Sequence, residues 1–278
     1  MKSPEARRAG RLEVLHEDEH VCVIVKPCGL LSCPHPGSRA RTAQDALEQL
    51  LRRRGALSRN HRPLIVHRLD RDTSGVMMFA LTEHAQELIM RQWHSMVTER
   101  LYRAVAENPA GGTELPDKGL IDDALSFNKH HRGFVPAEKR HKLVPARTHF
   151  SVVLRGKTHT LFELSLDTGK KNQIRAHLAN RGYPLCGDKN YRARTDRFRR
   201  LCLHARTLSF VHPFTKEELS FCVPEPHEWL AYVAAGDPNP ELPPWSEGGA
   251  DKEPALRRRA SAKEKARLGF IELGQTRR

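Results

Sequence analysis

The sequence predicts an α+β domain built on a mainly antiparallel mixed sheet with flanking helices and loops. Short β-rich runs follow one another as neighbours, and segments with helical periodicity are few. The βαβ alternation that marks a parallel sheet is rare. Of the 278 residues, 38% are hydrophobic, so a sizeable core is available and wholesale disorder is not expected.

The first elements are a pair of strands and a helix. Two β-rich runs lie at 12–16 and 20–25, with the polar turn HEDE between them. Helical periodicity follows over 42–55, where Thr42 is placed to cap the N-terminus and Gly55 to end the helix. We therefore expect an amphipathic helix after the first hairpin.

The next segment predicts two strands around a polar turn, at 64–69 and 76–81. Thr82 can cap a second amphipathic helix, and a strand over 100–107 follows it. The turn between the two strands is DRDTSG, residues 70–75.

The second half of the chain is again mostly β. Its predicted strands are 147–155, 159–166, 201–210 and 218–223. A short helix over 171–181 ends at Gly182. Residues 108–145 are expected to form a long loop, either functional or disordered. This loop carries a basic cluster of Lys129, His130, His131, Arg132, Lys139, Arg140, His141 and Lys142.

Composition divides the chain into three parts. Residues 1–11 are a basic lead, 12–235 form the globular domain, and 236–278 form a Pro/Gly linker and a basic mobile tail. The tail is expected to be helical near 254–269 and to add affinity for phosphates. No internal repeats are visible.

The formal net charge is +14, from 47 Lys and Arg against 33 Asp and Glu. Such a surplus favours a polyanionic partner over a merely solvated surface, because each neutralised phosphate releases condensed counterions. No apolar run approaches the ~20 residues that span a bilayer, and no secretory signal is present, so we expect a soluble cytoplasmic protein. The six cysteines form no C-x-x-C pair, and reduced thiols fit better than a metal at Cys28, Cys33 and His35.

The most informative segment is VHRLDRDTSGVMMFA, residues 66–80. Asp70 follows a predicted strand, in a tight polar turn that can present a carboxylate to a cleft. Arg68 and Arg71 flank it, and either could keep Asp70 ionised and bring phosphates near it. The plainer alternative is that Asp70 or Asp72 only accepts backbone N–H bonds in the turn. Local chemistry leaves both interpretations open.

The nonapeptide HRLDRDTSG resembles the signature of the RluA-type pseudouridine synthases, whose catalytic aspartate follows the Leu of HRLD. Four other segments resemble further motifs of that family: VKPCGLLSCP (25–34), RLYRAV (100–105), DTGKKNQIRAHLANRGYPLCGDKNY (167–191) and RLCLHARTLSFVHPFT (200–215). They occur in the family's order and span roughly 20–225, which is most of the chain. The resemblance implies the pseudouridine synthase fold with an active-site cleft across the sheet.

The resemblance implies roles for individual residues. Asp70 would attack the nucleotide or abstract the ribose C2′ proton. Tyr102 would stack on the base and remove a proton late in the reaction, and Arg175 would pair with Asp70. Leu203 is expected either to form the opposite pocket wall or to be a plain core leucine. Arg68 would fill the gap left by the flipped uridine.

Three further residues are expected to contact the substrate, namely Lys26, His67 and Arg71. The implied activity is that of an RNA pseudouridine synthase, an isomerase that acts on specific uridines of rRNA or tRNA. The reaction is redox-neutral, and the chain has no phosphate-binding Gly-rich loop, so we expect no cofactor, nucleotide or metal. The expected partner is RNA, with no membrane, and the expected state is a monomer.

The chain departs from the family pattern in two places. Asn172 stands where the family often has His, and an amide still donates and accepts hydrogen bonds. The basic lead of about 10 residues is too short for the S4-type RNA-binding module, so we expect the catalytic domain, the basic loop and the tail to hold the RNA.

Two other functions stay open. A metal-dependent nuclease could use His67, Asp70 and Asp72, although the spacing of the two carboxylates suits a shared metal only in an extended turn. A catalytically silent RNA-binding or ribosome-assembly protein on the same fold is the second, although Asp70, Tyr102 and Arg175 are all present.

Overall fold

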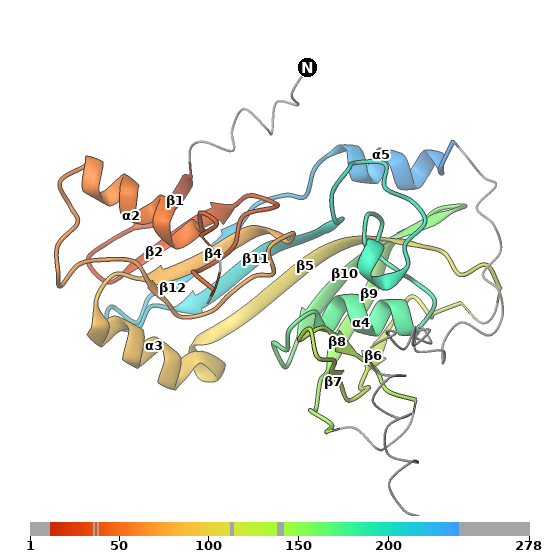
Figure 1. Cartoon of the computed structure of the whole chain (residues 1–278), viewed down its shortest axis with the longest axis horizontal. Helices are drawn as coiled ribbons and strands as arrows, with labels where there is room; N and C mark the ends of the chain where they lie inside the picture. Colours follow the sequence, from red (N-terminus) through yellow and green to blue (C-terminus); the bar gives the residue numbers. More distant parts are fainter. Residues whose placement is uncertain (1–11, 36, 38, 112–113, 138–141, 239–278) are drawn as a thin grey trace, which may run out of the picture. The chain divides into compact units, whose positions relative to one another are not determined.

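The computed structural model describes residues 12–238 except 36, 38, 112–113 and 138–141. The described part contains a ten-stranded sheet in which the strand order is β1-β2-β4-β11-β5-β10-β9-β6, with β3 paired to β4 and β12 to β11. All described pairings in this sheet are antiparallel except β11 with β4. The predicted α+β class with a mixed, mainly antiparallel sheet is confirmed (Figure 1).

Several expectations concern residues that the structure does not describe. The basic lead 1–11, the tail from 239 onward and the helix near 254–269 lie outside the described residues. Lys139, Arg140 and His141 of the basic loop also lie outside them. The three-part division of the chain therefore stays a prediction.

The first hairpin and helix form as the local sequence predicts. Strands β1 (Glu13–Glu17) and β2 (Val21–Lys26) pair antiparallel, and α2 (Ala43–Arg53) follows. The Thr42 side chain accepts from the Asp45 N–H, and the Asp45 carboxylate accepts from the Thr42 N–H, which is a complete capping box. The apolar face of α2 packs on the β2 and β4 side chains.

The predicted strand 64–69 is wrong in its extent, because β3 has only two residues, Leu64–Ile65. These residues pair with β4 (Ser74–Ala80). The strand stops because a side chain replaces a backbone carbonyl as the acceptor for the next β4 residue. His67 Nε2 accepts the Met78 N–H at 2.9 Å. Residues 66–73 are thereby released from the sheet to form the turn that contains Asp70.

Helix α3 (Glu83–Met96), capped by Thr82, leads directly into the long strand β5 (Val97–Glu107). β5 pairs with β11 (Leu203–Val211) on one side and with β10 (His159–Leu166) on the other. Tyr102 lies in the middle of β5, opposite Leu164 and Ala205. This register places the tyrosine at the centre of the sheet.

The remaining elements complete the sheet and its flanking helices. They are β6 (Lys118–Ile121), β7 (Ser126–Phe127), β8 (Gly133–Phe134), β9 (Thr148–Arg155), α4 (Gln173–Asn180), the 3-10 turn η1 (Lys189–Tyr191), β12 (Glu218–Cys222) and α5 (Glu228–Ala235). The expected long loop 108–145 therefore contains three short strands. Helix α5 was not predicted, and its Trp229 and Val233 are fully buried.

No helix in the described part of the chain combines the length and apolar character needed to cross a membrane. The six cysteines are free thiols.

Candidate active site

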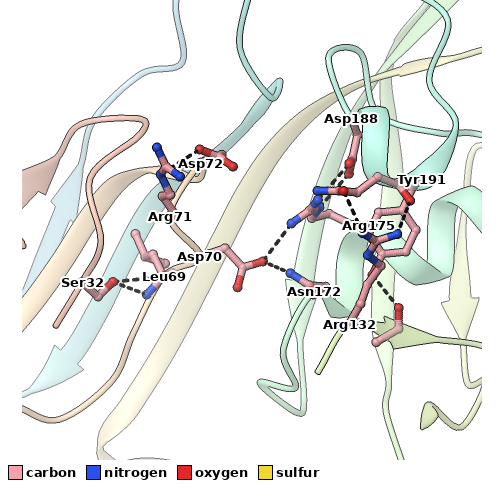
Figure 2. A network of polar contacts seen from close by, with 12 residues as sticks. Ser32, Leu69, Asp70, Arg71, Asp72, Arg132, Asn172, Arg175, Asp188 and Tyr191 are labelled. Carbon is pink, nitrogen blue, oxygen red and sulfur yellow. Dashed lines mark hydrogen bonds and ion pairs between the residues drawn. The ribbon is translucent and has the colours of Figure 1, made fainter. Parts of the chain in front are cut away.

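Asp70 lies in the turn between β3 and β4, and the VKPCGLLSCP segment holds this turn in place. The buried Ser32 hydroxyl donates to the Leu69 carbonyl at 2.7 Å and accepts the Leu69 N–H at 3.1 Å (Figure 2). The Asp70 carbonyl accepts the Thr73 N–H at 3.1 Å, which closes the turn. Two motifs that are far apart in sequence therefore form one support for the carboxylate.

Lys26 lies beneath this turn and is fully buried. Its ammonium donates to the carbonyls of Pro27, Leu30 and Arg71 at 3.0, 2.7 and 3.0 Å. Burial lowers the pKa of Lys26 to about 8. Lys26 does not line the pocket that contains Asp70. Lys26 does line the larger cavity next to it. The geometry supports a lysine that positions the turn, and the expected substrate contact stays a prediction.

The Asp70 carboxylate is held by two side chains from the α4 end of the sheet. Asn172 Nδ2 donates to Asp70 Oδ2 at 2.5 Å, and Arg175 Nη1 lies 3.5 Å from the same oxygen (Figure 2). Asn172 has a left-handed backbone with φ of 58°, a conformation that asparagine adopts more readily than most residues. This conformation also starts α4 at Gln173, two residues after the predicted start at 171.

Arg175 is itself anchored from behind. Asp188, buried in the Gly-Asp turn, accepts from Arg175 Nε at 2.6 Å and from Nη2 at 2.8 Å. The Tyr191 ring lies under the guanidinium, 5.0 Å from its central carbon. Burial works against the charged form, but the bonds to Asp188 and the attraction of Asp188 and Asp70 outweigh it and raise the pKa of Arg175. Arg175 is therefore a fixed positive charge beside Asp70.

Two glycines allow the close backbone contacts that the site requires. A Cβ on Gly75 would lie 2.0 Å from the Ala205 carbonyl oxygen, where β4 runs parallel to β11. A Cβ on Gly187 would lie 2.0 Å from the Arg200 carbonyl oxygen, and Gly187 has φ of 80°. No other residue fits these positions without moving the Asp70 turn or Asp188.

Asp70 opens into a pocket with a volume of about 410 Å³, in the range of small-molecule sites. Tyr102, Leu166, Ile174 and Leu203 contribute apolar surface to its walls. Burial raises the pKa of Tyr102, and the nearby Asp70 charge adds to the rise while Arg100 opposes it. The pocket thus combines one carboxylate with an aromatic and aliphatic lining.

His67 also lines the pocket, but its ring nitrogen is already engaged with Met78. Its ring packs against Trp93 with 4.8 Å between centroids. Burial lowers the pKa of His67 to about 3, and the positive charge of Arg100 adds to this effect. The imidazole is therefore neutral near pH 7 and forms part of the wall, and its expected contact with the substrate stays a prediction.

Neither arginine beside Asp70 in sequence has an ion pair or hydrogen bond to it among the described residues. Arg71 turns away, donating to the Gly29 carbonyl at 3.2 Å and lying 3.9 Å from Asp72 (Figure 2). Arg68 is exposed on the pocket lining and makes no side-chain hydrogen bond or ion pair within the described part of the chain. Arg68 is therefore free to contact a ligand, whereas Arg71 is part of the turn.

Sequence reasoning missed Arg100, which lines the pocket from β5. Its Nη2 donates to the Leu166 carbonyl at 2.9 Å, and its guanidinium lies 5.8 Å from the Trp93 ring centroid. Side chains two residues apart on a strand share a face, so the position of Arg100 two residues before Tyr102 was a usable signal.

The described residues contain no cluster of three His, Cys, Asp or Glu side chains placed to hold a metal ion. Asp72 lines a different cavity from Asp70. Since the His67 ring is bonded to Met78 as well, the three groups of the nuclease hypothesis do not converge.

A second, larger cavity of about 1420 Å³ adjoins the first, and Arg175 lines both. Exposed cations in its lining include Arg54, Lys189 and Arg199. Arg54 is paired with Glu17 and Lys189 with Asp196, at 2.7 and 3.1 Å. Arg199 makes no side-chain hydrogen bond or ion pair within the described residues. The lining offers positive charge next to the carboxylate pocket.

Comparison with known proteins matches residues 20–180 to the family described as RNA pseudouridylate synthase. Over 238 residues the chain is 36% identical to the ribosomal large subunit pseudouridine synthase D of Xylella fastidiosa, covering 81% of this chain and 69% of that protein. The protein of the same name from Neisseria meningitidis serogroup B is 36% identical over 78% of this chain and 59% of its own length.

A third relative, the uncharacterized RNA pseudouridine synthase YlyB of Bacillus subtilis, is 36% identical over 80% of this chain and 72% of its own length. Among solved structures, human RNA pseudouridylate synthase domain containing 4 superposes with a TM-score of 0.61 at 23% identity, covering 78% of this chain and 90% of that chain. The expected pseudouridine synthase fold is thereby confirmed.

Proposed function

Because the chain belongs to the RNA pseudouridylate synthase family, we propose that it isomerises uridines of large-subunit ribosomal RNA, with Asp70 as the catalytic carboxylate. The protein is an RNA pseudouridine synthase, an isomerase. The observation that carries the assignment of Asp70 is its position in a partly apolar pocket, in contact with Asn172 and the fixed charge of Arg175.

The reaction breaks the bond between ribose C1′ and uracil N1, turns the base, joins C1′ to C5 and releases the hydrogen from C5. An ionised Asp70 can serve either as a nucleophile or as the base that removes the C2′ proton. Arg175 and Asn172 both contact Oδ2, so Oδ1 is the oxygen we assign to the substrate.

The detached uracil must be held while it turns, and the pocket walls supply this. Tyr102, Ile174 and Leu203 would flank the base and exclude water. The raised pKa of Tyr102 keeps its phenol protonated at neutral pH, which favours stacking over the removal of a proton. We therefore assign Tyr102 to holding the base.

A stacked uridine reaches the pocket only after it is flipped out of the RNA, at a cost of a few kcal/mol. Arg68 is exposed on the lining of this pocket and has no partner among the described residues, so it is available to occupy the vacated position. The larger cavity, with Arg199 and Lys189 in its lining, would receive phosphates next to the target.

The choice of ribosomal RNA follows the names of the Xylella and Neisseria relatives, of which this chain covers 69% and 59%. Transfer RNA is the other expected target. We propose that the enzyme works as a cytoplasmic monomer without a nucleotide or metal cofactor, since the isomerisation is redox-neutral and needs no activated group.

The test is tritium release from RNA labelled at uridine C5, with Asp70→Asn beside the wild type. Ribosomal and transfer RNA would come from a strain that lacks the protein. Release from ribosomal RNA by the wild type but not by Asp70→Asn supports the proposal. If the wild type releases tritium only from transfer RNA, the substrate is reassigned. Wild type that binds RNA but releases no tritium from either pool would favour the catalytically silent RNA-binding protein.

A further inference from the structure

Tyr191 contacts Arg175, the partner of Asp70, and lies outside the two cavities described above. It lies at the end of η1 and lines neither the pocket of Asp70 nor the larger cavity. Its ring packs with the buried side chains of Leu125, Ala146 and Ala176. Burial raises the pKa of Tyr191, and the charges of Asp188 and Asp70 contribute to the rise. A protonated phenol outside both cavities is placed to act through its neighbours.

The first neighbour is Arg175, whose guanidinium lies over the Tyr191 ring at 5.0 Å. Asp188 fixes one edge of the guanidinium through Nε and Nη2, so Nη1 is the end that faces Asp70 at 3.5 Å. A contact along one edge restrains translation in the plane but leaves the group free to tilt. The ring covers one face and removes part of that freedom.

The second neighbour is the β7–β8 hairpin. The Tyr191 hydroxyl donates to the Gly133 carbonyl at 2.5 Å. Arg132 donates to the Asn190 carbonyl at 3.1 Å and to its side-chain oxygen at 2.8 Å. A Cβ on Gly133 would lie 2.6 Å from the Lys171 carbonyl oxygen, so the hairpin backbone also packs against the residue before Asn172. The hairpin thus contacts Tyr191, which packs on Arg175, and Lys171, which precedes Asn172.

We propose that Tyr191 is a positioning residue that ties the β7–β8 hairpin to the Asp70–Arg175 pair. The chain of contacts runs from the Gly133 carbonyl through the Tyr191 hydroxyl and ring to Arg175 and then to Asp70. Figure 2 shows Tyr191, Arg175 and Asp70. The hairpin turn carries Lys129, His130 and His131, which are exposed. RNA seated on this turn would hold the residue that orients Arg175. The inference rests on the proposed catalytic role of Asp70.

The kinetic test compares Tyr191→Leu, which removes the ring, with Tyr191→Phe, which removes only the bond to Gly133. We expect Tyr191→Leu to lower kcat about tenfold and Tyr191→Phe about threefold, because small misplacements of catalytic groups have large effects. KM should stay within about twofold for both, since neither change reaches the substrate. Tyr183→Phe is the matched control, because it also removes a buried hydroxyl bonded to backbone, that of Leu115, and should keep wild-type kcat.

A double-mutant cycle separates positioning from a loss of stability. If Tyr191 acts through Arg175, Tyr191→Leu should lower kcat no further in the Arg175→Lys background. Additive effects, or a kcat for both Tyr191 variants within about 1.5-fold of wild type, would overturn the proposal. A loss of kcat that Tyr183→Phe shares, in step with a lowered unfolding midpoint, would overturn it too.

A spectroscopic measurement keeps the test independent of turnover. In protein labelled with ¹⁵N-arginine, the Nε–Hε signal of Arg175 is identified by its absence in Arg175→Lys. We expect it to shift and broaden in Tyr191→Leu, to shift less in Tyr191→Phe and to keep its position in Tyr183→Phe. An unchanged signal in Tyr191→Leu would refute the positioning role. Wild type that releases no tritium but gives the expected spectra would refute the proposed catalysis and leave the positioning intact.

Discussion

Asn172 donates a 2.5 Å hydrogen bond to Asp70 from a left-handed backbone, across 102 residues of sequence. The amide thus donates a hydrogen bond to the carboxylate, as a histidine at this position could. Its contact, like that of Arg175, is to Oδ2, so Oδ1 has no bond to either residue.

Substitution of Asn172 should separate the contribution of this hydrogen bond from that of the backbone. Asn172→Gly keeps the left-handed conformation and loses the donor, so we expect kcat to fall about tenfold with little change in stability. Asn172→Ala loses the donor and also strains the backbone, which should lower the free energy of unfolding by about 1–2 kcal/mol. Urea unfolding beside single-turnover tritium release measures both. Equal stability of the two variants would contradict the assigned strain.

Acid should destabilise the protein through His67. Its pKa is about 3 in the folded protein, against the ordinary histidine value of 6.5 in the unfolded chain, so the unfolded chain binds more protons between these values. Stability contributed by the neutral ring is therefore present above pH 6.5 and is lost as the pH falls through that window. Each pH unit in this range removes up to ~1.4 kcal/mol.

The measurement is urea unfolding of wild type and His67→Gln at pH 7 and pH 5. Glutamine cannot titrate and its oxygen can still accept the Met78 N–H, so the variant should lose less stability between the two pH values, by about 1–2 kcal/mol. His204, whose pKa burial lowers to about 4, titrates in both proteins and cancels in the difference. Parallel pH curves would show that His67 is not buried in its neutral form.

The two aspartates that contact Arg175 should differ in what they stabilise. Asp188→Asn breaks a buried bidentate pair, so we expect a loss of about 3 kcal/mol in stability together with a large loss of activity. Asp70→Asn removes a 3.5 Å contact on a more exposed group and should change stability by less than about 1 kcal/mol while abolishing turnover. Thermal unfolding and tritium release compare them, and a larger destabilisation by Asp70→Asn would reverse the assignment.

Arg68 should matter most where the target uridine is stacked. If its side chain fills the gap left by the flipped base, Arg68→Ala should lower kcat/KM about tenfold on a target inside a helix and much less on a single-stranded target. Arg71→Ala is the matched control, because the Arg71 side chain faces Gly29 and Asp72. Equal losses on the two substrates would point to a phosphate contact for Arg68 instead.

Much of the fold follows from local sequence. The cap at Thr42 and the helical spacing of apolar residues over 42–55 predicted α2, because capping and amphipathicity are local properties. The strand 64–69 was predicted too long because the His67 side chain replaces backbone in the ladder, and the β-rich composition of the segment does not reveal this. Helix α5 escaped prediction because its eight residues follow a Pro-containing segment without a polar cap.

The site could be predicted only in part, because its contacts join residues that are far apart in the sequence. The sequence neighbours Arg68 and Arg71 were the natural candidates to pair with Asp70, but the contacts come from Asn172 and Arg175, about a hundred residues away. Arg175 was reached through family resemblance rather than local chemistry. The link from Tyr191 to the hairpin needed three-dimensional structure, since neither residue type nor spacing indicates it.

Arg199 should contribute to RNA affinity through phosphate contact. It is exposed in the lining of the larger cavity, which is the path proposed for RNA. Arg199→Ala should weaken RNA binding several-fold and lower the slope of log affinity against log salt by about one, with kcat at saturating RNA unchanged. Arg197→Ala is the control, because Arg197 is exposed two residues earlier but does not line the cavity. If both variants lose the same affinity, the effect is one of overall charge, and the larger cavity is not the path of the RNA.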